Sequence, residues 1–377
     1  MVKISTHCMA VLATVLGLCG PALVQAQIRI GQTSGFTGPV AASVNEINVG
    51  AKLYIDSINA EGGINGQQIE LVSLDDKFQV PLAVENAKKL IADPKVVSLF
   101  LNRGTPHAQA LMPLLAEGRI TLIAPSTGAM IMHSPVNPWI FNVRATYQIE
   151  AERVTRHLAL AGLDRVAVVY VNDTFGEDAA QGALKVFKEA GKTPTILQAI
   201  DRAKPDYNEV VAKIAASKPL GILIIGSSTS VASGIAAIRA SGSQAAIATL
   251  SNNAATGFVK SLGANQAGII VSQVFPSERR LAAPLIAEAV RLANLKKIPQ
   301  ITPAMIEGFA AAKVLVLGLK RAAKDNKEVT RSSLKKALES FNRVDIGGLE
   351  VSFSTTDHTG LDFADLSIID ADGAFRR

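Results

Sequence analysis

The stretch Ile28-Arg-Ile-Gly-Gln-Thr33 opens the pattern that decides the fold, because a strand rich in β-branched residues leads here into a helical repeat. Apolar side chains recur at helical spacing between Ile47 and Ile58, which is typical of a helix with one buried face. Gly62-Gly63 ends this helix, and 68–74 has the composition of a second strand. A strand, a helix and a strand of these lengths predict a parallel sheet covered by helices on both faces.

The same alternation continues along most of the chain. A helix is predicted through 84–91, another over 105–117, and a third from Tyr147 after an extended bridge at 137–146. The later predicted strands are 96–101, 120–124, 165–171, 194–200, 220–226, 247–251 and 268–274. Because this number of parallel strands exceeds the usual size of one sheet, we expect two sheets of about five or six strands each.

The pattern changes after Pro276. Three successive helices are predicted near 280–296, 302–323 and 329–341. A short β-rich tail follows, with strands at 350–353 and 366–369 and a turn at Asp372-Gly373.

Residues 1–26 have the pattern of an export signal. Lys3 supplies a positive start, Met9 to Leu18 is an apolar run too short to span a bilayer, and small residues precede a cleavage site after Ala26. A lipid anchor on Cys19 is not expected, because Leu18 precedes it where a lipoprotein signal has a small residue. We therefore predict a periplasmic protein with no membrane insertion. Cleavage would remove both cysteines, Cys8 and Cys19, and with them any disulfide.

Composition and motifs exclude several classes of function. The net charge is +6, but the basic residues are scattered and aromatic residues make up only 5%, which disfavours nucleic-acid binding. The histidines lack the spacing of metal ligands, so no metal site and no cofactor is expected. No nucleophile elbow, Walker loop or zinc-protease motif occurs, so the chain is not predicted to be an enzyme. The enzymatic alternative is an exported hydrolase that pairs Ser126 or Ser227 with His107.

Small hydroxyl and glycine residues follow three predicted strands, at 34–38, 103–106 and 124–128. Open α/β sheets bind ligands at the carboxyl ends of their strands. Thr105 is predicted to be a helix N-cap with Pro106 at the first helical position. The Thr105 hydroxyl and the free N–H groups of that turn could instead hold a ligand carboxylate. Capping alone remains the alternative for each segment.

Five motifs resemble the periplasmic leucine/isoleucine/valine-binding family, the type I solute-binding receptors of ABC importers. They are Ile30-Gly-Gln-Thr-Ser-Gly-Phe-Thr-Gly-Pro39, Ile58-Asn-Ala-Glu-Gly-Gly-Ile-Asn-Gly66, Pro125-Ser-Thr-Gly128, Tyr170-Val-Asn-Asp-Thr-Phe-Gly176 and Asp370-Ala-Asp-Gly373. The resemblance covers essentially the whole chain after residue 26.

The resemblance implies an α/β fold of two Rossmann-like lobes, each a mostly parallel sheet flanked by helices, joined by three hinge crossings. Lobe one would hold 27–143 and 277–362, and lobe two would hold 147–275 and 363–377. The first crossing would be 141–146, and the second would lie near Phe275-Pro276. The implied ligand site is the cleft between the lobes.

The resemblance also implies the site residues. Gly104, Thr105, Ser126, Thr127 and Gly128 match positions that hold the ligand carboxylate, and Phe175 matches an aromatic of lobe two. The full set of predicted ligand-binding residues is Phe36, Arg103, Gly104, Thr105, Ser126, Thr127, Gly128, Tyr147, Phe175, Ser227, Asn252 and Phe275.

One departure from amino-acid-binding relatives changes the expected ligand. Such relatives present an acidic residue to the ligand ammonium, but no Asp or Glu occurs between Val210 and Val274. Asp173 and Glu278 are carboxylates that could reach the cleft. Neither stands at the position of the acidic residue in those relatives. Arg103 could bind a carboxylate, although a solvated surface arginine remains the alternative. We therefore expect a small organic anion, an aromatic or aliphatic carboxylate, rather than a branched-chain amino acid.

The function that these observations indicate is capture of a small-molecule ligand, an organic anion or an amino acid, by lobe closure and its delivery to an inner-membrane ABC permease. A periplasmic sensory subunit on the same fold is the alternative, because the lobes would be the same in both.

Overall fold

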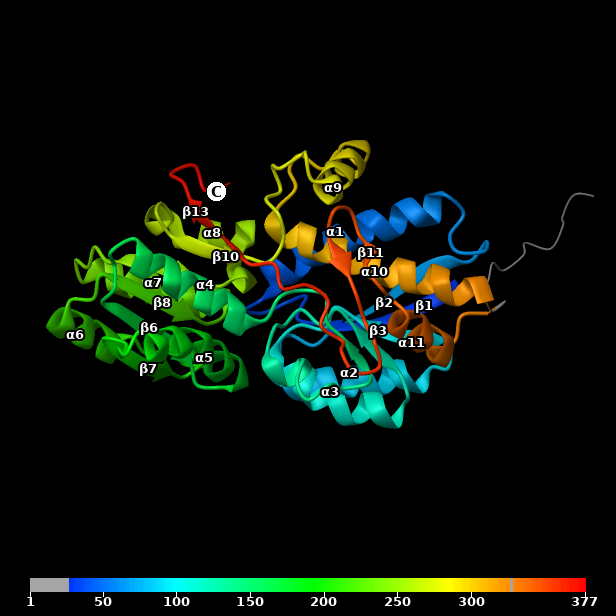
Figure 1. The fold of residues 1–377 in the computed structure, drawn as a ribbon, viewed down its shortest axis with the longest axis horizontal. Helices are drawn as coiled ribbons and strands as arrows, with labels where there is room; N and C mark the ends of the chain where they lie inside the picture. The colour runs from blue at the N-terminus through cyan, green and yellow to red at the C-terminus, as the bar shows by residue number, and fades with distance from the viewer. Residues whose placement is uncertain (1–26, 326–327) are drawn as a thin grey trace, which may run out of the picture.

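The computed structural model describes residues 27–325 and 328–377 and shows two α/β lobes lying side by side (Figure 1). The predicted export signal and its cleavage after Ala26 lie outside the described residues. Within the described ranges, no helix is long and apolar enough to cross a membrane.

The first lobe is built on a five-stranded sheet with the order β2-β1-β3-β4-β5, in which every neighbouring pair is parallel. Its strands are β1 Gln27–Ser34, β2 Gln68–Asp75, β3 Val96–Phe100, β4 Thr121–Ile123 and β5 Ile140–Phe141. Its connecting helices are α1 Ala41–Ala60, α2 Val80–Ala92 and α3 Thr105–Glu117, and a short 3-10 turn covers Met130–Met132. The sequence pattern predicted β1 to β4 and α1 to α3, whereas β5 lies within the segment predicted to be an extended bridge and the 3-10 turn was not predicted.

The second lobe is built on a seven-stranded sheet with the order β14-β13-β10-β9-β8-β6-β7. Its strands are β6 Val166–Val171, β7 Ile196–Ile200, β8 Gly221–Ile225, β9 Ala246–Thr249, β10 Ile270–Gln273, β13 Asp365–Ile369 and β14 Phe375–Arg376. Its helices are α4 Tyr147–Leu160, α5 Thr174–Glu189, α6 Asn208–Ser217, α7 Ser228–Ala240 and α8 Thr256–Leu262, with 3-10 turns at Ser251–Asn253 and Gly263–Asn265. The sheet is larger than the expected five or six strands because the tail strands β13 and β14 extend one edge in antiparallel pairing.

Between β10 and β13 the chain returns to the first lobe. Helices α9 Pro284–Leu295, α10 Pro303–Asp325 and α11 Arg331–Glu339 pack there, and β11 Val344–Asp345 pairs with β12 Glu350–Val351. We call the five-stranded sheet with its helices and α9 to α11 lobe one, and the seven-stranded sheet with its helices lobe two.

Helices α1 and α10 cross with their backbones in contact in lobe one. A Cβ added to Gly50 would lie 1.9 Å from the main-chain oxygen of Met305, and one added to Gly308 would lie 1.8 Å from that of Ile47. Only glycine fits at such a crossing. This contact fixes α10, and therefore Glu307, against the sheet of lobe one.

The chain passes between the sheets three times, at 142–146, at 274–283 and at 352–364. The first and third passages run together. The Asn142 N–H donates to the His358 carbonyl at 2.9 Å, and the Gly360 N–H donates to the Asn142 carbonyl at 2.9 Å. Two of the connections between the lobes are thus joined by backbone hydrogen bonds.

Candidate ligand-binding cleft

A narrow cleft lies where the loops after the strands of both lobes face each other. Ten residues line it: Val40, Phe78, Arg103, Gly104 and Thr105 from lobe one, and Tyr147, Phe175, Arg202, Ser227 and Asn252 from lobe two. Seven of these are among the twelve residues expected from the sequence. A larger surface hollow, lined in part by Arg165, Leu220 and Ala246, lies at the amino ends of the lobe-two strands, where sheets of this kind do not bind ligands.

Arg103 is buried in the wall of the cleft, with 4% of its surface exposed. One guanidinium nitrogen donates to the Ser126 hydroxyl at 2.8 Å, and another donates to the main-chain oxygen of Asn252 at 2.9 Å. The second contact crosses from lobe one to lobe two. Among the described residues no carboxylate forms an ion pair with Arg103. The alternative of a solvated surface arginine is wrong, and the guanidinium keeps N–H groups that these two bonds do not use.

Ser126 is placed to orient Arg103. Its hydroxyl donates to Glu307 at 2.6 Å while it accepts from Arg103. A serine hydroxyl has a single proton. In this arrangement Ser126 therefore has no proton left for a ligand, and it acts through the arginine.

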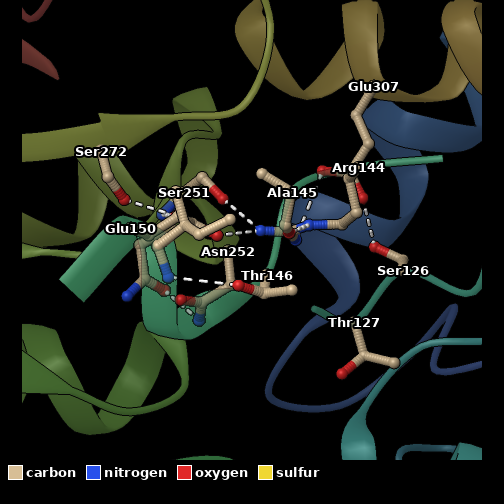
Figure 2. A network of polar contacts seen from close by, with 12 residues as sticks. Ser126, Thr127, Arg144, Ala145, Thr146, Glu150, Ser251, Asn252, Ser272 and Glu307 are labelled. Atoms are coloured by element: carbon tan, nitrogen blue, oxygen red, sulfur yellow. Dashed lines mark hydrogen bonds and ion pairs between the residues drawn. The ribbon is translucent and has the colours of Figure 1, made fainter. Parts of the chain in front are cut away.

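A buried ion-pair network lies behind this wall and reaches the first connection between the lobes (Figure 2). Arg144 forms an ion pair with Glu150 of α4, lies 3.9 Å from Glu307 of α10, and donates to the Ser251 hydroxyl at 2.7 Å. Burial works against the positive charge of Arg144, but Glu150 and Glu307 outweigh it and raise its pKa. The network joins the hinge segment to both lobes.

No sequence signal pointed to this network. Arg144 stands in an extended bridge, and Glu150 and Glu307 each occupy one position of a helix that was predicted from its apolar residues. Only the packing of α4 and α10 brings their side chains to Arg144.

The α3 terminus differs from the expectation. The helix begins at Thr105 and its N-cap is Gly104 with φ of 97°, so the prediction that Thr105 is the N-cap is wrong. The Thr105 hydroxyl instead lies 2.7 Å from the Thr127 hydroxyl. One hydroxyl of the pair donates its proton to the other. The proton of the accepting hydroxyl then remains free for a ligand. The N–H groups of the first turn of α3 are the other donors expected at this point.

Gly128 is covered by the hinge backbone. A Cβ there would lie 2.6 Å from the Ala145 carbonyl oxygen and 2.8 Å from the Tyr147 nitrogen, and the Tyr147 N–H donates to the Gly128 carbonyl. This close approach explains the absence of a side chain, and Gly128 is not among the lining residues.

Aromatic rings form much of the remaining cleft surface. The rings of Tyr147 and Phe175 meet edge to face at 4.7 Å, and Phe78 stacks on His107 at 4.4 Å. The guanidinium of Arg202 lies 5.6 Å from the ring of Phe78 in lobe one and 5.6 Å from the ring of Phe175 in lobe two. Sequence reasoning missed three lining residues, Val40, Phe78 and Arg202. The position of Phe78 just after the end of β2 was the signal that could have indicated it.

The other predicted residues lie around the cleft. Ser227 lines it as the N-cap of α7, whereas Phe36 is half-buried outside the lining set. Phe275 borders the space beside Arg144 and Glu307. Thus the structure gathers seven of the twelve predicted residues in the lining and leaves five outside it, which are Phe36, Ser126, Thr127, Gly128 and Phe275.

The lining carries two cations and no carboxylate. Arg202 is ion-paired with Asp173, which also accepts hydrogen bonds from the first turn of α5. Glu278 is buried but is not among the lining residues. Arg103 is therefore the lining cation without a direct carboxylate partner in the described part of the chain.

His107 lies beneath Phe78 as a neutral ring. Burial lowers its pKa to about 4, and Arg202 adds to the decrease. Neither ring nitrogen has a hydrogen-bond partner among the described residues. Ser126 donates to Glu307, and neither Ser126 nor Ser227 bonds a nitrogen of His107, so the pairing required by the hydrolase alternative does not form. The described residues also contain no group of His, Cys, Asp and Glu able to hold a metal ion.

The comparisons with known proteins agree with this geometry. The leucine-, isoleucine-, valine-, threonine- and alanine-binding protein of Pseudomonas aeruginosa is 26% identical over 190 residues, which is 50% of each chain. This chain spans about half the length of the curated relatives it matches first.

Two crystal structures resemble it over nearly their whole length. The substrate-binding periplasmic protein from Ralstonia solanacearum is 28% identical, with a TM-score of 0.84, and the match covers 93% of this chain and 99% of that one. The extracellular ligand-binding receptor from Verminephrobacter eiseniae is 26% identical, with a TM-score of 0.83, and the match covers 93% and 100%.

The model of a family described as periplasmic binding protein matches residues 27–373. Relatives and fold alike are those of binding proteins and not of enzymes. The chain therefore belongs to the periplasmic binding protein family, and its relatives include proteins named for binding leucine, isoleucine and valine.

Proposed function

We propose that this protein is the extracytoplasmic receptor of an ABC importer and captures a small organic anion, a carboxylate without an ammonium group. The observation that carries the proposal is Arg103, a buried guanidinium in the cleft wall with no direct carboxylate partner among the described residues. The nearest acid reaches it only through the Ser126 hydroxyl.

A ligand carboxylate would complete the surroundings of Arg103. Burying a charge without a paired ion costs several kcal/mol, and a carboxylate matches the planar fork of a guanidinium. The free proton of the Thr105–Thr127 pair and the first turn of α3 supply further donors close by. These donors all lie on lobe one, so we propose that lobe one binds the anion first.

An amino acid fits the lining less well. Its ammonium would enter a cleft lined by Arg103 and Arg202 and by no carboxylate. A buried ammonium without a partner loses about 2–5 kcal/mol relative to a paired one. The aromatic rings of Phe78, Tyr147 and Phe175 suit an apolar or aromatic body. Some relatives are named for amino acids, and the ligand that we propose here differs from theirs in lacking the cation.

Capture would proceed by closure of the lobes. We propose the boundaries 27–143 with 277–362 for lobe one and 147–275 with 363–377 for lobe two, hinged at 141–146 and near Phe275-Pro276. The bond from Arg103 to the Asn252 carbonyl joins the lobes and must break when they separate. The closed surface is what a membrane permease would recognise.

Calorimetry on the purified protein tests the ligand class. We expect binding of 3-phenylpropanoate or 4-methylpentanoate and no binding of phenylalanine or leucine, which have the same carbon skeletons with an ammonium group. X-ray scattering should show a smaller radius of gyration when the bound acid is present. Tight leucine binding without acid binding, or identical scattering profiles in every compound that binds, would overturn the proposal.

A further inference from the structure

The side chain of Asn252 presents a buried acceptor at the cleft. Asn252 is 6% exposed and lines the cleft, and its Oδ1 has no hydrogen-bond donor among the described residues. We infer that the ligand itself supplies this donor, and that it is a 2-hydroxycarboxylate whose carboxylate binds Arg103 and whose hydroxyl donates to Asn252. This inference rests on the proposed function and narrows its ligand class.

The amide orientation follows from its partners. The Asn252 Nδ2 donates to the Gly226 carbonyl at 2.9 Å, and to the Asn253 Oδ1 at 3.3 Å. A carbonyl oxygen can only accept, so the nitrogen must face Gly226 and the oxygen must face the other way. Exchanging the two atoms would place one acceptor against another. Asn252 therefore offers an acceptor that the protein leaves unfilled.

The position of Asn252 places the ligand hydroxyl next to the carboxylate. The main-chain oxygen of the same residue accepts a hydrogen bond from Arg103 at 2.9 Å. The amide oxygen belongs to the same residue as this main-chain oxygen. It therefore lies close to the guanidinium of Arg103. A carboxylate on Arg103 brings its own α-carbon to this region, and a hydroxyl on that carbon is the substituent best placed to donate.

A hydroxyl suits this position better than an ammonium. Asn252 can offer only a neutral carbonyl oxygen, and the neighbouring cleft charges are the cations Arg103 and Arg202. An ammonium would meet like charges and no compensating carboxylate, whereas a hydroxyl meets neither problem. An acid without the hydroxyl would leave Oδ1 buried and unpaired. The site should therefore discriminate among three acids that differ only at the α-carbon.

The test compares a matched set of probes. These are 3-phenylpropanoate, both enantiomers of 2-hydroxy-3-phenylpropanoate and phenylalanine, with 4-methylpentanoate, 2-hydroxy-4-methylpentanoate and leucine as the aliphatic set. We expect one enantiomer of a hydroxy acid to bind about 10-fold or more tightly than the acid without the hydroxyl, and the amino acid to bind worst. Equal affinities of the hydroxy acid and the unsubstituted acid would overturn this inference and leave the proposed function standing. Binding of no acid in either set would overturn both.

Two variants locate the discrimination. Asn252→Ala should reduce the affinity ratio of hydroxy acid to unsubstituted acid to about 1. Thr105→Ala, on the carboxylate side, should weaken both acids and preserve the ratio. Asn252→Ala is expected to fold, because Asn253 Nδ2 also donates to the Gly226 carbonyl, at 3.3 Å. A ratio that persists in folded Asn252→Ala contradicts the inference, and the wild-type ratio tests it even if the variant does not fold.

Discussion

The hydroxyl of Ser126 donates a hydrogen bond to the buried carboxylate of Glu307, with 2.6 Å between the two oxygens. The residues stand 181 positions apart in the chain. Through this bond a carboxylate on α10 orients a serine after β4, and the serine in turn holds Arg103. The cleft wall therefore depends on the packing of α10 against lobe one.

We predict that Glu307 supports ligand binding by position and not by charge. Glu307→Ala should weaken carboxylate binding about 10-fold, because Ser126 and then Arg103 lose their orientation. Glu307→Gln keeps an acceptor for Ser126 and removes a negative charge near the anion site, so its affinity should not fall. Calorimetry with a carboxylate that binds the wild type measures both. Weaker carboxylate binding by Glu307→Gln together with unchanged binding by Glu307→Ala would contradict this role.

Two buried arginines should respond differently to removal. Arg103→Met should lower the affinity for a carboxylate by about 1.5–3 kcal/mol through lost charged hydrogen bonds. Arg144→Met should lower the free energy of unfolding by about 3–5 kcal/mol, because Glu150 and Glu307 lose their direct partner. Urea unfolding and calorimetry on both variants separate the effects. Arg103→Met should be the more stable of the two; the reverse order would show that Arg103 is mainly structural.

We predict a direct role for the Thr105 hydroxyl. Thr105→Ala should weaken carboxylate binding by about 1–2 kcal/mol, because it removes the hydroxyl that lies in the cleft lining and pairs with Thr127. Thr105→Ser keeps the hydroxyl and serves as the control. Unchanged affinity of the Ala variant would place the carboxylate elsewhere in the cleft.

The buried carboxyl of Asp76 should give stability a pH dependence. Burial raises its pKa to about 6, although Thr33 and the Phe78 N–H donate to it. A raised pKa means that the folded state prefers the protonated acid, so this stability is complete below the unfolded pKa and is lost as the pH rises through 6.

The measurement compares wild type with Asp76→Asn. The free energy of unfolding of the wild type, relative to the variant, should fall by about 3 kcal/mol between about pH 4 and pH 6. Urea unfolding at several pH values gives both curves, and other titrating groups cancel in their difference. A constant difference would mean that folding leaves the pKa of Asp76 unchanged.

The crossing of α1 and α10 should not accept a side chain. Gly50→Ala places a Cβ within 1.9 Å of the Met305 carbonyl oxygen, which is main chain and cannot move aside alone. We expect a loss of about 1–3 kcal/mol or more in the free energy of unfolding. Val49→Ala, at the exposed neighbouring position, is the control and should have a much smaller effect. If both variants lost the same free energy of unfolding, α1 and α10 could move apart without destabilising the protein.

Most of the fold could be predicted because it follows from local periodicity. Alternating strand and helix patterns predicted the parallel strands of both sheets except β5, and α3 has the predicted bounds Thr105–Glu117. The size of the lobe-two sheet was less predictable, because β13 and β14 are short and join it only through the pairing of β13 with β10 and of β14 with β13. Strand pairing across a long separation leaves little trace in the local pattern.

The chain by itself determined the architecture and the loops that carry the cleft, because apolar spacing and glycine positions act over a few residues at a time. It also showed the lack of an acid between Val210 and Val274. The tertiary structure alone decided which charges meet. Glu307, Arg144 and Glu150 lie together only because α4 and α10 are packed beside the hinge, and a charge pair between distant segments depends on three-dimensional distance, which residue spacing does not encode.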